Sequence, residues 1–214
     1  RNNFDYIRVE YFGDSNAAFE GFKSGAYTFR IENSSKQWAT GYDFPALNKG
    51  HIVKRELRDG TIATGQSFAM NLRKEKFKDI KVREALSLMF NFEWSNATLF
   101  YGLYARINSF WENSDLAAIG VPEGEELDLL TKLVDEGLIS TEILTNPAIP
   151  GPKSGSRQLD RKNLRAASKL LDDAGWVVGD DGKRRKEGKT LDVEFLEASP
   201  AFDRIVNPFV ENLI

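Results

Sequence analysis

The sequence predicts an α/β protein, and the first indication is a strand, a helix and a second strand in succession. Residues 4–12 alternate polar and apolar side chains, which is typical of a strand, and the stretch "YTFRI" (27–31) returns as a second, short strand. Between them a helix begins after Asp14, carries apolar side chains at helical spacing and ends at Gly25. Strands that alternate with helices are the units from which α/β sheets are built.

Strongly amphipathic helices are the second indication of this class. Short extended stretches, 51–57 and 65–72, precede a helix with a sharp start in "FKDIKVREALSLMFNFEW" (77–94). Asp79 is placed to cap this helix, and a further helical stretch continues to Gly102. The apolar stripe consists of Val82, Ala85, Leu86, Met89 and Phe90. A strand-to-helix turn is a place where a catalytic residue could be expected, but none stands there.

The second half of the chain repeats these patterns and ends with a hairpin. A helix over 125–137 is predicted to turn apolar residues inward, namely Leu127, Leu130, Leu133 and Val134. Residues 145–159 are rich in Pro, Gly and Ser and predict an exposed crossover. Asp160 then caps a helix whose predicted inward stripe is Leu164, Ala167, Leu170, Leu171 and Ala174. Residues 176–196 predict a hairpin with a solvated basic tip, and residues 201–214 predict a last helix.

Length and charge limit the function classes. The chain has 214 residues, enough for one large domain or two small ones. A net charge of -3 argues against nucleic acid or an anionic membrane as a partner, and no apolar run reaches the length of a membrane span. The absence of cysteine excludes disulfides, a thiolate nucleophile and cysteine metal ligands. Because the chain begins without Met and ends within a predicted helix, we expect it to be a piece of a longer protein.

No residue pattern points to catalysis, a metal or a cofactor. His51 is the single histidine and has no recognisable partner, and "GKRRKEGKT" (182–190) lacks both the glycine spacing and the following helix of a phosphate-binding loop. Two alternatives stay open. A hydrolase would need two of Glu32, Glu93 and Glu112 within roughly 5–10 Å in one cleft. An interaction module would present its aromatic residues as a flat apolar patch.

Aromatic residues cluster beside polar loops, and this pattern is typical of a cleft for a polar ligand. Trp38, with Tyr42 and Phe44, surrounds "ENSSKQ" (32–37), and a second group surrounds "RINS" (106–109). Rings provide contact area at low entropic cost, while amides and hydroxyls pair with the backbone groups of a ligand.

Three stretches resemble a known family: "AAFEGFKSGAYTFRIENSSKQWATGYDF", "SFAMNLRKEKFKDIKVREALSLMFNFEWSNATLFYG" and "NLRAASKLLDDAGW". The chain resembles, over nearly its whole length, the family-5 extracellular solute-binding proteins of peptide and nickel ABC importers. It looks most similar to the Yej-type oligopeptide-binding subgroup. The resemblance implies a lobe of the type II periplasmic binding fold, a mixed sheet flanked by helices. In the family the helix after Asp79 packs on this sheet and holds a cleft strand in place.

The resemblance also implies a place in a larger protein that closes two lobes over a hinge. Residues 1–144 would be the first part of the second large lobe, 145–159 a crossover, and 160–214 the rest of that lobe. The expected protein is periplasmic and monomeric, with a signal peptide in a preceding part of the chain. It would bind an oligopeptide or peptide-like compound, deliver it to the permease subunits of an importer and do no covalent chemistry.

The candidate ligand-binding residues come from two loops, the start of one predicted strand and one aromatic side chain. The aromatic pattern suggests Trp38, and the resemblance carries over the remaining positions, which are Glu32, Asn33, Ser34, Gln66, Ser67, Asn108, Ser109, Phe110 and Trp111. In oligopeptide binders of the family several of these positions are tyrosine, whereas this chain has Gln or Ser. The family's aspartate for the peptide amino terminus falls beyond the last residue of this sequence.

Overall fold

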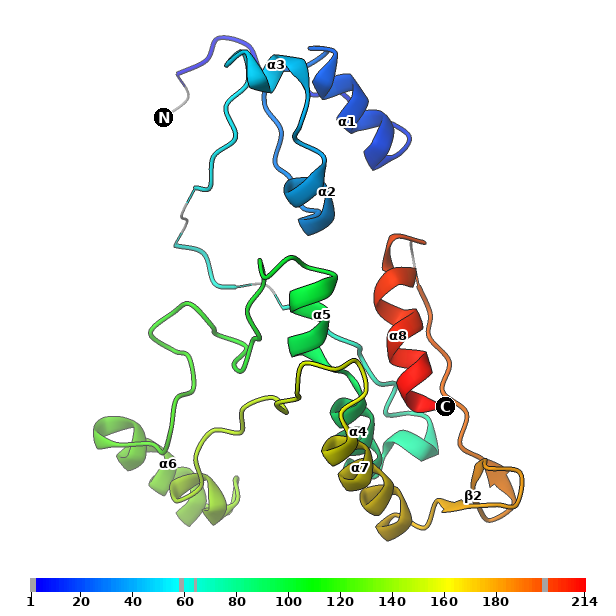
Figure 1. Cartoon of the computed structure of the whole chain (residues 1–214). Coiled ribbons are helices and arrows are strands. Elements are labelled where there is room, and N and C mark those ends of the chain that lie inside the picture. The colour runs from blue at the N-terminus through cyan, green and yellow to red at the C-terminus, as the bar shows by residue number, and fades with distance from the viewer. Residues whose placement is uncertain (1–2, 58–59, 64, 198–199) are drawn as a thin grey trace. The chain divides into compact units, whose positions relative to one another are not determined.

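The computed structural model describes residues 3–57, 60–63, 65–197 and 200–214, and the chain divides into two compact units (Figure 1). One unit is Arg1–Leu57 and the other is Arg58–Ile214. This boundary differs from the divisions at residues 145 and 160 that the sequence suggests. The assignment of the whole chain to one lobe stays a prediction.

The first unit is built on α1 (Ser15–Lys23), α2 (Ser35–Thr40) and α3 (Pro45–Asn48). The ends of α1 are those predicted from sequence. Asp14 accepts hydrogen bonds from the backbone N–H groups of the first turn, at 2.8 and 2.9 Å, and Gly25 follows the helix with φ of 79°. The core of this unit consists of Phe19, Phe22 and Phe44.

The strands predicted at 4–12 and 27–31 are wrong for the described part of this unit. Both segments carry neither a strand nor a helix assignment, and Tyr6 and Tyr11 are 95% and 91% exposed. Alternation shows only that a segment fits a pleated, half-buried surface, whereas a strand also needs a neighbour to complete its hydrogen-bond ladder. The described residues of this unit supply no such neighbour. Arg8 holds the first segment by donating to the carbonyl oxygen of Ala26 at 3.0 Å.

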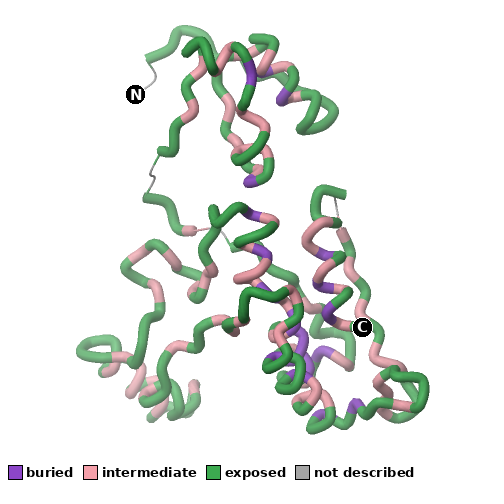
Figure 2. Tube along the Cα trace, in the orientation of Figure 1, coloured by how far each residue is buried: buried purple, intermediate pink, exposed green. Residues whose placement is uncertain are grey.

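The second unit centres on α4 (Ile80–Met89), which packs against α7 (Arg161–Asp173) and α8 (Asp203–Leu213). Figure 2 shows the buried residues of this unit concentrated along these helices. One buried cluster consists of Phe77, Val82, Leu86, Ala174 and Trp176, and a second consists of Ala85, Met89, Ala167 and Phe209. The short helix η1 (Glu75–Phe77) leads into α4 and adds Phe77 to the first cluster.

The predicted start and stripe of α4 are confirmed. Asp79 accepts a hydrogen bond from the backbone N–H of Lys81 at 2.9 Å, and the stripe residues Val82 to Met89 are buried. Phe90 is half-buried and ends the helix, because its ψ of 104° is not helical. A separate helix, α5 (Phe92–Thr98), follows with Asn91 as its cap.

The helix α7 confirms its predicted cap and most of its stripe. Asp160 accepts from the backbone N–H groups of Lys162 and Asn163 at 2.8 and 3.0 Å. The inward position of Leu164 is wrong, because this side chain is 39% exposed and the adjacent Asn163 is buried instead. Asn163 is satisfied there by donating to the carbonyl oxygen of Lys153 and to Ser154 Oγ, at 3.1 and 2.9 Å.

The hairpin region forms an antiparallel sheet in the order β1 (Val177–Val178), β2 (Arg184–Lys186), β3 (Lys189–Thr190). The solvated basic tip is therefore a wrong prediction, since most of that run is the middle strand. The reason is a turn at Glu187 and Gly188, where φ is 52° and 75°. This turn reverses the chain within the basic run, which the sequence analysis treats as one continuous tip.

The remaining helices are α6 (Gly124–Asp135), η2 (Thr141–Leu144) and η3 (Pro200–Phe202). The predicted inward residues of α6 are half-buried, and the described residues bury none of that helix completely. No helix in the described ranges has the length and apolar character that a membrane crossing requires. Helices with a small sheet agree with the predicted α/β class.

Candidate ligand-binding site

Glu32 is the centre of a buried network in the first unit. Its side chain is 3% exposed and lies 3.1 Å from Arg30, measured from Oε2 to Nε. Tyr42 donates its hydroxyl to the same oxygen at 3.1 Å, and the backbone N–H of Ser34 donates to Oε1 at 3.0 Å. Arg30 also donates to the hydroxyl of Tyr27 at 3.0 Å. The network ties the loop before α2 to the aromatic core of the unit.

The pKa shifts in this network follow from burial and from the carboxylate. Burial raises the pKa of Tyr42, and the nearby charge of Glu32 adds to the effect, so that the pKa reaches about 12. For Arg30, burial alone would lower the pKa, but hydrogen bonds to Tyr27 and Glu32 outweigh it and the pKa rises. The guanidinium therefore stays charged and the phenol stays protonated at neutral pH.

The other candidate residues of this unit differ in whether their side chains are accessible to a ligand. Ser34 caps α2, since its Oγ accepts from the backbone N–H of Gln37 at 3.2 Å. Trp38 is half-buried, and Lys54 Nζ lies 4.1 Å from the centroid of its ring and donates to its carbonyl oxygen. Asn33 is exposed. The carboxylate of Glu32 and the hydroxyl of Ser34 thus have structural roles, while Asn33 and the free part of Trp38 face solvent.

In the second unit, Gln66 and Ser67 are exposed at the start of an extended segment. Phe68 anchors the segment, because its ring centroid lies 5.2 Å from that of Phe209 and 5.5 Å from that of Phe90. An open concavity follows directly along the chain and is lined by residues 69–73. The anchored phenylalanine fixes where the two polar side chains emerge.

The loop at 108–111, the second-unit loop, combines polar anchors with exposed rings. Asn108 Oδ1 accepts from the backbone N–H of Gly151 at 2.9 Å. Ser109 Oγ accepts from the backbone N–H groups of Trp111 and Ala118, both at 3.2 Å. Phe110 is 97% exposed and Trp111 is 50% exposed. The polar side chains hold the loop, and the two rings are free to contact another molecule.

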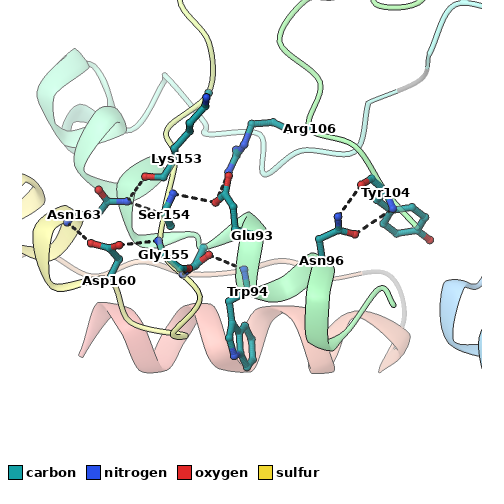
Figure 3. Close-up of polar contacts among 12 residues, drawn as sticks. Glu93, Trp94, Asn96, Tyr104, Arg106, Lys153, Ser154, Gly155, Asp160 and Asn163 are labelled. Carbon is teal, nitrogen blue, oxygen red and sulfur yellow. Dashed lines mark hydrogen bonds and ion pairs between the residues drawn. The ribbon is translucent and has the colours of Figure 1, made fainter. Parts of the chain in front are cut away.

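Two polar side chains of α5, Asn96 and Glu93, bind the segment that precedes this loop and the crossover (Figure 3). Asn96 binds the backbone of Tyr104 twice, donating to its carbonyl oxygen at 2.8 Å and accepting from its N–H at 3.1 Å. Glu93 Oε2 accepts from the backbone N–H of Ser154 at 3.0 Å and lies 3.7 Å from Nη2 of Arg106. The Pro-, Gly- and Ser-rich crossover is therefore attached to α5 through specific hydrogen bonds.

The three carboxylates of the hydrolase alternative have separate structural partners. Glu32 belongs to the first unit, where Arg30 and Tyr42 occupy it, whereas Glu93 is engaged by Ser154 and Arg106. Glu112 accepts from the backbone N–H of Asn108 at 3.1 Å. Within the described ranges, no group of acidic or histidine side chains could hold a metal ion.

The candidate residues are thus distributed over both units, with Trp38 in the first and Ser67 and Trp111 in the second. Comparison with known proteins identifies the family. Residues 1–213 match the model of the bacterial extracellular solute-binding proteins, family 5 (middle part). The chain belongs to this family. Family-5 solute-binding proteins have the type II periplasmic binding fold, so the predicted family and fold class are confirmed.

Several relatives match this family-5 chain over almost its whole length. It is 41% identical over 215 residues to the probable peptide-binding protein YejA of Agrobacterium fabrum (strain C58) and 38% identical over 214 residues to YejA of Escherichia coli (strain K12). It is 32% identical over 221 residues to the peptidoglycan-binding protein YepA of A. fabrum. These alignments cover at least 99% of this chain but only 34% to 35% of the relatives. The chain therefore spans about a third of their length.

Proposed function

We propose that the protein containing this chain is the periplasmic substrate-binding component of an ABC importer for oligopeptides or peptide-like compounds. The observation that carries the proposal is the family match over residues 1–213, together with 41% identity to a protein described as peptide-binding. This chain would form part of the second large lobe, and the ligand would lie in the cleft between two lobes. The permease subunits of the importer would be its partners, and the protein would act as a monomer.

The accessible candidate residues suit the recognition of a peptide. The amide and hydroxyl groups of Asn33, Gln66 and Ser67 can pair with the backbone N–H and C=O groups of a peptide, whatever its side chains. The exposed rings of Phe110 and Trp111 can cover the ligand and exclude water. Binding that relies on backbone groups would accept many peptide sequences, which suits uptake rather than signalling.

We propose that the protein leaves its ligand chemically unchanged. Glu93 and Glu112 each accept a backbone hydrogen bond, and Glu32 is paired with Arg30. A carboxylate held in this way is poorly placed to act as a general base, which must reach a water or a substrate proton. Closure of two lobes and their reopening would then be the whole cycle.

Fragments of peptidoglycan are a second ligand class, and one observation favours them. A relative that is 32% identical over 221 residues is described as a peptidoglycan-binding protein. Peptidoglycan fragments carry short peptides, so the same polar and aromatic side chains could hold the peptide part of such a ligand.

Titration calorimetry of the full-length protein tests the proposal. Peptides of several lengths, peptidoglycan fragments and free amino acids would be compared, and we expect saturable binding of at least one of the first two classes. Trp111→Ala and Trp38→Ala should weaken that binding by about tenfold, because aromatic anchors carry a large share of binding energy. Leu129→Ala, at an exposed position on α6, is the control and should bind normally. Absence of binding to every peptide-containing ligand would refute the proposal.

A further inference from the structure

Arg106 contacts both an aromatic ring and a glycine, and this packing determines its position. The guanidinium carbon is 4.8 Å from the ring centroid of Phe92 in α5. Arg106 also packs closely against Gly151, where an added Cβ would lie 2.6 Å from Arg106 Cδ and 3.1 Å from Nη1. Gly151 does not have a positive φ, so its backbone does not require glycine. The arginine side chain is what excludes a side chain at this position.

Hydrogen bonds do not explain why Arg106 occupies this place. Nε and Nη2 are buried and have no hydrogen-bond acceptor among the described residues, and Nη2 is 3.7 Å from Glu93 Oε2. That distance is too long for a hydrogen bond, although the opposite charges still attract. Burial lowers the pKa of Arg106 and the carboxylate of Glu93 opposes the shift, but the guanidinium remains charged. The contact with the Phe92 ring and the close packing against Gly151 therefore fix the group.

Arg106 stands two residues before the second-unit loop, and both make contact with Gly151. Arg106 packs against the Gly151 backbone, and Asn108 Oδ1 accepts from the Gly151 N–H at 2.9 Å. The next residues along the chain include the exposed rings of Phe110 and Trp111. The start of the loop is thus held at two adjacent points on one short piece of the crossover.

We infer that Arg106 is a positioning residue for ligand binding, and that its packing against Phe92 and Gly151 orders the second-unit loop before a ligand arrives. The inference rests on the proposed function, since it assigns Phe110 and Trp111 to the ligand. Ordering the loop in advance removes part of the entropy that binding would otherwise lose. Arg106 itself needs no contact with the ligand.

Hydrogen–deuterium exchange of the full-length protein without ligand tests the inference independently of the proposed function. Arg106→Ala should speed amide exchange in residues 107–112, because the loop loses its packing, while exchange in α4 stays unchanged. Arg165→Ala is the matched control, since it removes an exposed arginine on α7 and should leave the loop unaffected. Unchanged exchange at 107–112 in Arg106→Ala would overturn the inference even if peptide binding is demonstrated.

Ligand affinity and a double variant complete the test. Arg106→Ala and Gly151→Ala should each weaken peptide binding, by roughly tenfold, because a mobile loop must be ordered on binding. Adding Gly151→Ala to Arg106→Ala should weaken it no further, because the added methyl group then has no side chain to displace. Independent, multiplying effects of the two substitutions would contradict the packing argument. If the unaltered protein binds no peptide, the proposed function fails, and the exchange experiment still decides the role of Arg106.

Discussion

Arg30 and Glu32 form a buried ion pair in the loop that leads into α2. Nε of Arg30 lies 3.1 Å from Oε2 of Glu32, and the two side chains are 11% and 3% exposed. Tyr42 donates to the same carboxylate oxygen as Arg30, and the backbone N–H of Ser34 donates to the other oxygen. A residue that the family resemblance suggests as a ligand contact therefore also organises the first unit.

We predict that Glu32→Ala destabilises the protein by about 2 kcal/mol, because it leaves Arg30 buried without its partner. The value is below the largest costs for a broken buried pair because Arg30 keeps its hydrogen bond to the hydroxyl of Tyr27. Chemical denaturation of the full-length protein, with fluorescence of the first-unit tryptophan, would measure the change. Glu20→Ala is the control, since the Glu20 side chain is 67% exposed in its pair with Lys23, and it should cost less than about 0.5 kcal/mol. Equal effects of the two substitutions would contradict the structural role of Glu32.

The raised pKa of Tyr42 leads us to predict a loss of folding stability at alkaline pH. Its pKa is raised from 10.0 to about 12 in the folded protein. A raised pKa means that the folded state favours the protonated phenol, so this contribution is complete below pH 10 and disappears as the pH rises through 12. The difference in unfolding free energy between the unaltered protein and Tyr42→Phe should therefore shrink over this range. A difference that stays constant from pH 9 to about 12 would show that burial and the charge of Glu32 do not raise the pKa of Tyr42.

The helices could be predicted because their signals are local. Asp14, Asp79 and Asp160 each stand where the chain enters a helix, and all three cap it. The prediction of a strand at 4–12 is wrong because strand pairing depends on a partner that the alternation of side chains does not identify. The turn at Glu187 and Gly188 could not be predicted, because both residues have a positive φ and only Gly188 is of a type that commonly adopts it.

The packing of α4 against α7 predicts unequal effects of two leucine substitutions. Leu86 is 5% exposed within a buried cluster, whereas Leu164 is 39% exposed. Leu86→Ala should destabilise the second unit by about 3 kcal/mol, because it removes buried methyl groups and leaves a cavity. Leu164→Ala should cost about 1 kcal/mol, since 39% of its area already contacts water. Thermal or urea unfolding would measure both, and a larger effect at Leu164 would contradict the observed orientation of α7.

For the adjacent arginines of β2 we also predict unequal effects of alanine substitution on stability. Arg184 donates to Asp172 Oδ1, to the carbonyl oxygen of Trp176 and to Ser168 Oγ, each at 2.6 Å. Arg184→Ala should therefore destabilise the protein by about 2 kcal/mol, because these acceptors lose a charged donor. Arg185 pairs with Asp181 near the turn, and Arg185→Ala should have little effect on unfolding by urea. Indistinguishable unfolding curves for the two variants would mean that the basic run is a solvated tip after all.

The candidate site could be predicted only where single residues carry a signal. Trp111 and Phe110 stand out as aromatic residues in a polar loop, and both are at least half exposed. Arg106 gives no such signal, because its partners Phe92 and Gly151 are distant in the sequence and meet it only after folding. Asn163 was missed for a related reason, since a polar residue within an apolar stripe shows its role only through its acceptors.

Mass spectrometry of small molecules released from the gently purified full-length protein tests the central claim most directly. The family match and the accessible polar and aromatic residues predict intact short peptides, or peptide-bearing fragments, in stoichiometric amounts. A peptide added to the protein and recovered from it should have its original mass. Recovery of cleaved peptide, or saturable retention only of compounds without a peptide portion, would contradict the claim that this chain helps to bind peptides and release them unchanged.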